Sequence, residues 1–453
     1  MKISISNPLN IDLFEVVLFL IEYSPYIIAT FAAFLLYHFL HVVPTTTSKS
    51  SISTEKKTTT TKRSKFFYAL LIPTLIICIV ASVATSSWED AYKRGYQIFK
   101  LPSLRTKLET YIETGNDDLH SILESNMYAP TFGWIELRYL LKDLLRHTVF
   151  HTNDHNTDNI DEGYNKGNDW FKATLGETMM YTSGLYPTGD ETLTEAQNYK
   201  IDYVADAIQL EEGMSVLDIG CGWTYMTNRL TEKYGANVTG VTLSKEQLTY
   251  GKELNKDNDA KLFLQDAMRL KGERSDLIPK GGFDRITSLE MAEHVGIRRY
   301  QEFLTMVHGM MKDDGVFYFQ VAGLRRAWRF EDFIWGLFMG ECVFPGADAS
   351  CPLGWVTSQV ERAGFEIQRV HNMGSHYSRT LAHWLENWRS NEHYIVDKYG
   401  AQSYRRWEVF LAWSVRAARQ GSSTLFMLTL TKAGVEDRRI KSQAHLVPKD
   451  VQA

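Results

Sequence analysis

The sequence is poor in cysteine and carries no excess of positive charge, and both absences exclude classes of protein. Its four cysteines, Cys78, Cys221, Cys342 and Cys351, have neither the spacing of a zinc site nor that of a disulfide framework. We therefore expect a reducing compartment and no metal. The net charge of −5 is too acidic for a nucleic-acid-binding protein, so no nucleic-acid partner is expected.

The chain has 453 residues, too many for one compact core, and its amino terminus differs from the rest. Two segments, Ile11–Val43 and Phe66–Val83, are largely apolar. The cleanest part of the first, Tyr26–Val43, and the whole of the second each approach the ~20 residues that a membrane-spanning helix needs. A Ser/Thr/Lys-rich linker, 44–65, is too polar to fold between them. No cleavage site follows a short apolar core, so we predict a retained anchor of two membrane helices. One spanning helix with an interfacial or buried helix is the alternative.

The most informative segment is Val216–Trp223, where an apolar strand ends in an acid and opens into a glycine turn. Gly220 and Gly222 have no side chains, so a ligand could lie against bare backbone. Asp218 could accept bonds from an amino group or order the glycine loop. Tyr225 replaces the third glycine of a dinucleotide fingerprint, and the next strand lacks the terminal acid that would hold a nicotinamide ribose. We therefore predict a site for S-adenosylmethionine, which has no phosphate; a plain strand-to-helix turn is the alternative.

Strand and helix patterns alternate around this segment. Strands are predicted at Met214–Ile219, Asn237–Leu243, Lys261–Gln265, Phe283–Leu289, Val316–Ala322 and Ser423–Leu430, and helices near 224–234, 244–255, 298–312, 354–363, 378–398 and 403–419. This order predicts an α/β fold with a doubly wound, mostly parallel sheet, the Rossmann-like class I methyltransferase architecture. The last strand is expected to close the sheet edge.

We expect four parts along the chain. They are the membrane anchor 1–87, a helical region 88–185 that leads into the active site, an S-adenosylmethionine-dependent methyltransferase domain 186–435, and a tail 436–453.

Two further motifs follow the predicted strands at the edge where a ligand lies in such sheets. Thr242 and Gln247 flank the helix start after the second strand and could bond a ribose. A plain helix start with Ser244 as its N-cap is the alternative, and both can hold together. The other motif, Gln265-Asp266-Ala267, follows the third strand and is placed to bind an adenine amino group. An exposed loop with an acid is the alternative.

The segment Leu289–Gly296 brings two acids and a histidine to the ligand end of the fourth strand. Glu290 and Glu293 could share one helical face. A solvated acidic turn is the alternative; a zinc site is disfavoured because the spacing differs from that of a metalloprotease helix.

Aromatic residues are abundant, at 13% of the chain with 11 tryptophans. They are dense in the insert Trp328–Trp355, directly after the fifth strand, where a lid over the active site belongs. A core helix explains this insert as readily as a lipid cleft does.

Together these motifs resemble the cyclopropane-fatty-acid-synthase family of S-adenosylmethionine-dependent methyltransferases, and within it the membrane-anchored sphingolipid 9-methyltransferase branch. The resemblance extends from about Asn165 to Lys432. It is carried by the segments 168–171, 180–184, 217–223, 240–244, 289–296, 313–317, 334–339, 344–350, 352–355 and 414–421. The two apolar segments also fit this branch.

The resemblance implies a catalytic carboxylate at Glu293 and an aromatic hydroxyl at Tyr377. In cyclopropane synthases a cysteine and a histidine join these two groups to hold a bicarbonate ion. Ser183 and Gln320 stand at the matching positions, which leaves bicarbonate doubtful and argues against cyclopropane formation. Glu293 is expected to take a proton, or to orient a water that does, with the other three residues fixing it.

The resemblance also implies that Tyr181, Thr182 and Trp223 belong to the cofactor site. Thr224 departs from the family, which usually has glycine there, and we expect cofactor binding to survive the change. Tyr181, Trp170 and Tyr377 are candidates to stabilise a carbocation, each by about 0.5–2 kcal/mol through cation–π attraction.

The implied reaction transfers a methyl group from S-adenosylmethionine to carbon 9 of a long-chain base that is unsaturated at carbon 8, in a ceramide or glucosylceramide. Methyl transfer leaves a carbocation, and loss of a proton from the methylated carbon then restores the double bond. The nearest alternative is a cyclopropane fatty acid synthase acting on unsaturated phospholipid acyl chains. A methyltransferase acting on oxygen or nitrogen would need a polar acceptor pocket, and a non-enzymatic lipid-binding protein would tolerate loss of the glycine turn.

Charge does not set the orientation in the membrane, because the basic residues of the linker and those after the second apolar segment nearly balance. S-adenosylmethionine is made in the cytosol, so we expect the catalytic part there. The expected protein is integral to the membrane of the endoplasmic reticulum or Golgi. The sequence gives no oligomeric state.

Overall fold

A computed structural model of the chain describes residues 104–116, 118–126, 166–326, 332, 335, 336, 338, 339, 343 and 351–435. The chain divides into two compact units, Met1–Pro102 and Ser103–Ala453, and the described residues all belong to the second. No helix among them is both long enough and apolar enough to cross a bilayer. The predicted membrane segments, the linker and the tail 436–453 lie outside the described residues.

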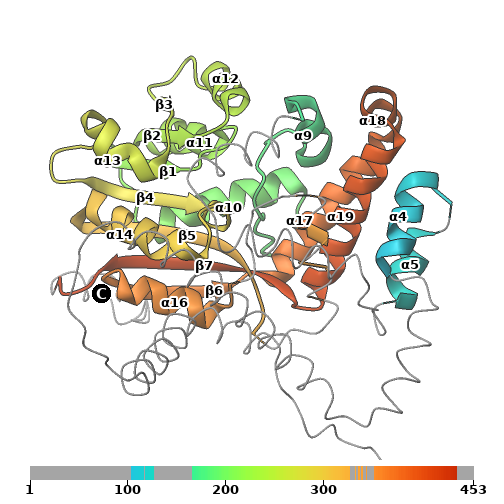
Figure 1. Ribbon diagram of the computed structural model, residues 1–453. Coiled ribbons are helices and arrows are strands. Elements are labelled where there is room, and N and C mark those ends of the chain that lie inside the picture. Colours follow the sequence, from blue (N-terminus) through green and yellow to red (C-terminus); the bar gives the residue numbers. More distant parts are fainter. Residues whose placement is uncertain are drawn as a thin grey trace, which may run out of the picture. The chain divides into compact units, whose positions relative to one another are not determined.

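One sheet of seven strands, in the order β3-β2-β1-β4-β5-β7-β6, forms the centre of the second unit (Figure 1). The strands are Ser215–Ile219 (β1), Asn237–Thr242 (β2), Lys261–Leu264 (β3), Phe283–Leu289 (β4), Met311–Leu324 (β5), Phe365–Asn372 (β6) and Ser423–Lys432 (β7). Strands β1 to β5 pair in parallel, whereas β7 runs antiparallel to β5 and β6. The predicted α/β fold with a mostly parallel sheet is confirmed.

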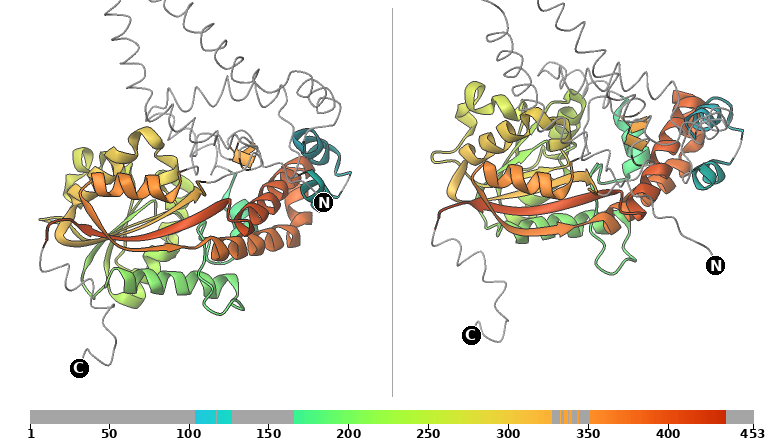
Figure 2. Two further views of the ribbon diagram at one scale, coloured as in Figure 1. Left: turned by 90° about the horizontal axis from the view of Figure 1, so that it is seen from below. Right: turned by 60° about the horizontal axis from the view of Figure 1, so that its bottom comes forward.

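Helices cover both faces of this sheet. The helices are Leu104–Thr114 (α4), Leu119–Asn126 (α5), Asn168–Leu175 (α9), Leu193–Ala207 (α10), Tyr225–Tyr234 (α11), Lys245–Leu254 (α12), Leu270–Glu273 (α13), Tyr300–Met310 (α14), Leu353–Arg362 (α16), Gly374–Ser390 (α17), Glu392–Tyr399 (α18) and Ala401–Arg419 (α19). Alternate side chains of a strand point to opposite faces. Leu217 of β1 therefore packs with α14 and α16, and Val216 packs with α10 and α11. Figure 2 shows these two pairs of helices on opposite faces of the sheet.

A second core, rich in tryptophan, lies among α9, α17 and α19. Trp170 of α9 contacts Trp388 of α17 and Trp407 of α19, with ring centroids 4.7 and 5.6 Å apart. Trp223 of the glycine turn belongs to the same cluster, and Tyr181 packs against it. The aromatic residues therefore form a core whose edge borders the glycine turn.

Only part of the aromatic insert 328–355 is described. Trp335 and Phe338 are buried in the tryptophan-rich core, where Phe338 packs on Trp413 with ring centroids 5.4 Å apart. For these two residues the core interpretation holds, and most of the rest of the insert lies outside the described residues.

The structure corrects three sequence predictions about the second half of the chain. Strand β6 was missed, because most of its residues are half-buried or exposed and its apolar alternation is interrupted by a register shift between Ile367 and Arg369. It, rather than β7, closes the sheet edge. The helix predicted at 378–398 is two helices, α17 and α18, which are separated at Asn391.

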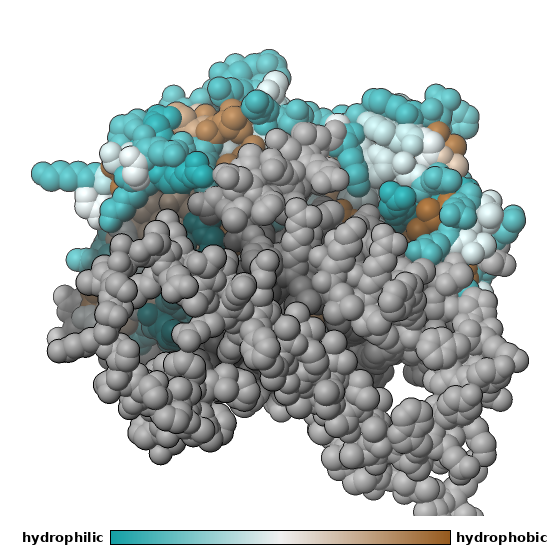
Figure 3. All heavy atoms as spheres, in the orientation of Figure 1, coloured by the Kyte–Doolittle hydropathy of each residue, from teal (hydrophilic) through white to brown (hydrophobic). Residues whose placement is uncertain are grey.

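On the face drawn in Figure 3, the visible described residues are mostly hydrophilic, with small separate hydrophobic patches. The large apolar side chains exposed in the described residues include Leu254 at the end of α12 and Leu264 at the end of β3. Isolated exposed apolar residues of this kind are common on soluble folds and do not by themselves mark a binding surface.

Candidate active site

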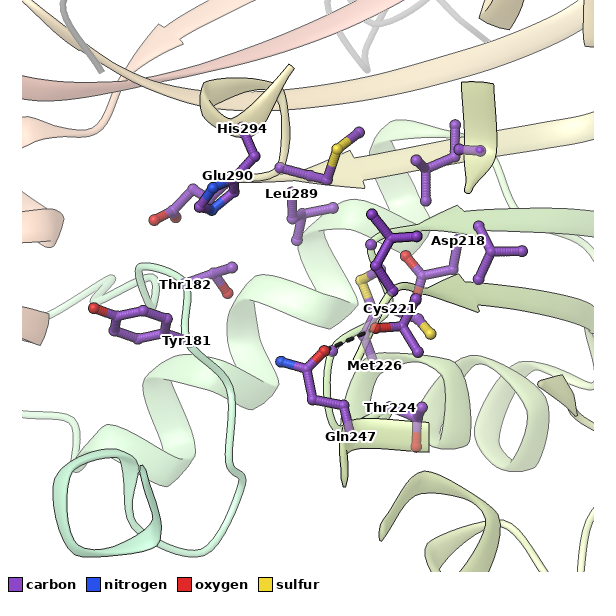
Figure 4. A pocket seen from close by; sticks show the side chains of 18 of the residues that line it. Tyr181, Thr182, Asp218, Cys221, Thr224, Met226, Gln247, Leu289, Glu290 and His294 are labelled. Atoms are coloured by element: carbon purple, nitrogen blue, oxygen red, sulfur yellow. Dashed lines mark hydrogen bonds between the residues drawn. The ribbon is translucent and has the colours of Figure 1, made fainter. Parts of the chain in front are cut away.

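The glycine turn after β1 forms one wall of a cavity at the carboxyl edge of the sheet (Figure 4). Gly220 and Gly222 have φ values of +74° and +55°, a region that side chains disfavour. The N–H groups of Gly220 and Cys221 both donate to the carbonyl of Val241, each over 3.0 Å, which ties the turn to β2. A Cβ atom on Gly220 would lie 2.6 Å from Cγ of Met291, so only glycine fits there without a shift.

Asp218 lines the cavity just before this turn, and its carboxylate is held from two sides. The hydroxyl of Thr227, on α11, donates to Oδ2 over 2.8 Å, and that of Thr287, on β4, donates to Oδ1 over 3.0 Å. Burial raises the pKa of Asp218 to about 6. These bonds tie the end of β1 to α11 and β4, and neither donor belongs to the glycine turn itself.

The motif after β2 also lines the cavity. Thr242 donates its hydroxyl proton to Oε1 of Gln247 over 2.8 Å, which leaves the amide nitrogen of Gln247 for a ligand (Figure 4). Ser244 accepts a bond from the backbone N–H of Gln247 and caps α12. The helix-start and ligand interpretations therefore hold together.

The motif after β3 is placed at the same edge. Gln265, Asp266 and Ala267 all line the cavity. Asp266 accepts a bond from the N–H of Met268 and so begins a short 3-10 helix, while Gln265 donates to Glu273. These bonds hold the loop, and the remaining carboxylate oxygen of Asp266 lies 3.7 Å from the Arg269 guanidinium.

A loop from outside the sheet, which contains Tyr181 and Thr182, forms the opposite wall of the cavity (Figure 4). Helix α10 holds this loop: Gln197 donates to the carbonyl of Thr182 over 2.6 Å, and Lys200 donates to its hydroxyl. The ring of Tyr181 packs on Trp384, with centroids 5.1 Å apart. The predicted cofactor residues thus converge on one cavity from four separate segments.

The predicted catalytic residues gather beside this cavity, but around a different acid from the one predicted. The backbone N–H of Ser183 and the side-chain amide of Gln320 both donate to Oε1 of Glu290, over 2.8 and 2.6 Å. Glu293 instead accepts a bond from the N–H of Ala322. Glu290 lines the cavity, whereas Glu293, Ser183, Gln320 and Tyr377 are not among its lining residues.

Two groups near this acid cluster, Lys200 and Thr380, were not singled out from the sequence. Lys200 is fully buried on α10, and burial lowers its pKa to about 7. Thr380 of α17 accepts a bond from the N–H of Gly184 over 2.9 Å. His294 lines the cavity, and burial lowers its pKa to about 4, so it is neutral at pH 7. A signal existed for Lys200, which shares a helical face with the buried Ala196 and Val204.

Thr224, the departure from glycine, adopts a left-handed backbone conformation with φ of +68°. Its hydroxyl accepts a bond from Asn255 over 2.8 Å, and its methyl group fills the space beside Gly251. The chain therefore accommodates the threonine by keeping a glycine in the facing helix.

This pairing predicts a change of sign in a double-mutant cycle. A Cβ atom on Gly251 would lie 2.5 Å from Cγ2 of Thr224, so Gly251→Ala alone should destabilise the fold by about 1–3 kcal/mol through overpacking. In a Thr224→Gly background the same change should stabilise it by about 0.5–1 kcal/mol, because alanine is the better helix former. Thermal unfolding of the four proteins measures both values; equal effects in the two backgrounds would contradict this packing.

The cavity suits S-adenosylmethionine. A Cβ atom on Gly222 would meet no atom within 4 Å, so the backbone there is open to a ligand. Polar groups at the glycine turn, at Gln247 and at Asp266 alternate with apolar side chains such as Met226 and Met268. This fits a ligand with a charged amino-acid end, a ribose and a flat base, and no phosphate. Among the described residues no cluster of three His, Cys, Asp or Glu side chains could hold a metal.

The residues around Glu290 do not fit a bound bicarbonate ion. The positions that match the family's cysteine and histidine, Ser183 and Gln320, already donate to a carboxylate of the chain itself. An anion between them would have to displace Glu290 or approach it closely, and like charges at such separations repel strongly in a buried site. We therefore derive no step through bicarbonate.

The sheet order, the glycine turn and the cavity define a class I S-adenosylmethionine-dependent methyltransferase fold. The chain belongs to the mycolic acid cyclopropane synthetase family, whose model matches residues 151–428.

Within the family the chain is similar to named sphingolipid enzymes. It is 44% identical over 344 residues to sphingolipid C9-methyltransferase 2 of Gibberella zeae, which covers 74% of this chain and 65% of that protein. It is 42% identical over 305 residues to the sphingolipid C9-methyltransferase of Komagataella phaffii, covering 65% and 62% of the two chains. The matches therefore span less than two thirds of these relatives. The cyclopropane-fatty-acyl-phospholipid synthase of Escherichia coli is more distant, at 29% identity over 276 residues.

Solved structures agree with this assignment. The cyclopropane synthase MmaA2 of Mycobacterium tuberculosis superposes with a TM-score of 0.57 at 26% identity, covering 61% of this chain and 98% of that one. The mycolic acid cyclopropane synthase CmaA1 in complex with SAH and CTAB gives a TM-score of 0.56 at 27% identity, with the same coverage.

Proposed function

We propose that the protein transfers a methyl group from S-adenosylmethionine to carbon 9 of a sphingoid base that is unsaturated at carbon 8, in a ceramide or glucosylceramide. The observation that carries this proposal is the cavity itself: an S-adenosylmethionine site bordered by an aromatic wall and by a buried cluster of acids. The relatives named as sphingolipid C9-methyltransferases supply the substrate class.

The bound cofactor supplies an electrophilic methyl group, and the substrate double bond is the nucleophile. The protein therefore needs no nucleophilic side chain, and its residues must align the alkene, exclude water and manage positive charge. Tyr181, which packs on Trp384 beside the cavity, can stabilise a nearby cation with its ring face. A buried carboxylate beside the same cavity can accept the proton whose loss restores the double bond.

Cyclopropane formation is the second candidate, because the family and its solved members include cyclopropane synthases. The hydrogen bonds from Ser183 and Gln320 to Glu290 disfavour it, since they occupy the groups that would face bicarbonate.

The acceptor is tested with full-length protein in detergent and S-adenosylmethionine labelled in its methyl group. Three lipids are compared: a ceramide unsaturated at carbon 8, the same ceramide saturated there, and a phospholipid with an unsaturated acyl chain. We expect label in the first lipid alone. Label in the phospholipid instead would favour the cyclopropane alternative, and label in a saturated ceramide would contradict an alkene nucleophile.

We also propose that the two apolar segments anchor the protein in the membrane of the endoplasmic reticulum or Golgi, with the catalytic part facing the cytosol. The supply of S-adenosylmethionine and the insolubility of the lipid support this. Protease added to sealed microsomes should remove a carboxyl-terminal tag without detergent; protection of the tag would contradict the orientation.

A further inference from the structure

The position of Glu290 is unusual for a half-buried acid. It follows directly after β4, has a left-handed φ of +52°, and lines the cavity on the same side as Tyr181 and Thr182 (Figure 4). Its backbone N–H donates to the carbonyl of Gln320 over 2.8 Å, so the start of the turn is tied to β5. A non-glycine residue is held in this conformation only when its surroundings fix it, and such positions cluster at active sites.

Two donors fix one oxygen of the Glu290 carboxylate. The Ser183 N–H and the Gln320 amide both donate to Oε1, from a loop on one side and a strand on the other. Within the described part of the chain, neither of these bonds involves Oε2. One oxygen is therefore anchored and the other is available to accept a proton.

The charges around Glu290 come from every element packed against it. The Lys200 ammonium on α10 lies close enough to lower the pKa of the acid, and Asp218 on β1 interacts with the same lysine. Glu290 and Glu293 both lie near enough to the Tyr377 hydroxyl to raise its pKa. Burial nevertheless outweighs these effects and leaves the pKa of Glu290 raised. An acid with a raised pKa is a stronger base once it is ionised.

We propose that Glu290 is the built-in general base of the reaction and takes the place that a bound anion would otherwise have. This inference rests on the proposed function. The alkene pair forms a bond from carbon 9 to the methyl carbon, while the methyl–sulfur pair leaves with sulfur and a cation remains at carbon 8. Glu290 then accepts the proton on carbon 9, and that carbon–hydrogen pair restores the double bond. The proton passes to water after product release.

Glu293 has a different role from Glu290. It does not line the cavity, and its Oε1 accepts the N–H of Ala322 on β5. We assign it as a positioning residue that fixes the turn on which Glu290 stands. This differs from the sequence-based hypothesis, in which Glu293 takes the proton.

The decisive variants are Glu290→Gln and Glu290→Gly, with Glu253→Gln at an exposed acid outside the cavity as the control, all in the full-length protein. Glycine suits the left-handed backbone at position 290, so Glu290→Gly should fold and should bind S-adenosylmethionine within about threefold of wild type. Calorimetric binding measures this without turnover. Methyl transfer should fall about 10²–10⁴-fold in both Glu290 variants, the range of a lost general base.

Chemical rescue separates a base from a structural residue. Removing the side chain leaves the Ser183 and Gln320 donors facing a space, so added bicarbonate or acetate should restore part of the activity of Glu290→Gly and none of that of Glu290→Gln. Wild-type activity should not depend on bicarbonate in carbon-dioxide-free buffer. Residual product of Glu290→Gln should contain shifted double bonds, because the cation must lose a different proton.

Failure of the Glu290 assignment and failure of the proposed function give different results. Near-normal turnover in Glu290→Gln, or a bicarbonate requirement in the wild type, would overturn the assignment. An inactive wild type would instead contradict the proposed function; infrared difference spectra of wild type and Glu290→Gln across a pH series would still show whether a carboxyl at this position titrates above its ordinary range.

Discussion

Binding of S-adenosylmethionine should weaken at least about 100-fold when Gly220 is replaced by alanine, a loss of about 2.7 kcal/mol. The new Cβ atom would lie 2.6 Å from Cγ and 3.0 Å from Cβ of Met291, atoms too close to the backbone to move freely. The φ of +74° adds a penalty of about 1–2 kcal/mol for a residue with a side chain. Because the turn itself must shift, the loss should appear in calorimetric binding.

Gly213→Ala is the matched control for this prediction. Gly213 has a similar φ of +80°, but a Cβ atom there would meet nothing within 4 Å, and the residue does not line the cavity. It should lose about 1–2 kcal/mol of stability from backbone strain and keep its affinity for S-adenosylmethionine. Equal affinities for the two variants would show that the glycine turn does not form the site.

Lys200→Met should both destabilise the fold and shift the pH dependence of methyl transfer. The lysine is fully buried, and its removal takes its charge away from Glu290 and Asp218 and leaves the buried Thr182 hydroxyl without its donor, which should cost about 1–3 kcal/mol. The Lys200 charge lowers the pKa of Glu290, so its loss should raise that pKa further. The base is active when ionised, so the acidic limb of the rate profile should move to higher pH.

A second substitution tests the coupling between these residues. In Lys200→Met/Glu290→Gln the buried acid is neutral, so most of the lost stability should return. Lys256→Met, at an exposed lysine paired with Glu253, should change neither stability nor the pH profile measurably. If the losses of the two single variants simply add, Lys200 and Glu290 do not interact.

Local patterns were sufficient to predict much of the site. The strand, acid and glycine turn of Val216–Trp223 lie within a few residues of one another, and the ends of β2 and β3 reach the same edge because parallel strands share a direction. The fold class was therefore sufficient to predict that Gln247 and Asp266 line the same cavity. Strand β6 lacked such a signal, since its half-exposed residues show no clear alternation.

The partner of Ser183 and Gln320 could not be predicted in this way. Glu290 and Glu293 are three residues apart, and either could reach the cavity if the turn formed a regular helix. The left-handed φ at Glu290 breaks that regularity and directs the two carboxylates to different donors. Lys200 shares a helical face with buried residues of α10, but its bond to Thr182, 18 residues away, depends on how that loop folds against the helix.

The most direct test of the account is the identity of the product. Full-length enzyme in detergent is incubated with S-adenosylmethionine and a ceramide unsaturated at carbon 8, and the product is hydrogenated before mass analysis. Methyl-branched and cyclopropane products both gain one CH2 and have the same mass, but only the branched alkene still takes up hydrogen at that site. The account predicts uptake; a product that resists hydrogenation would show a cyclopropane synthase and contradict it.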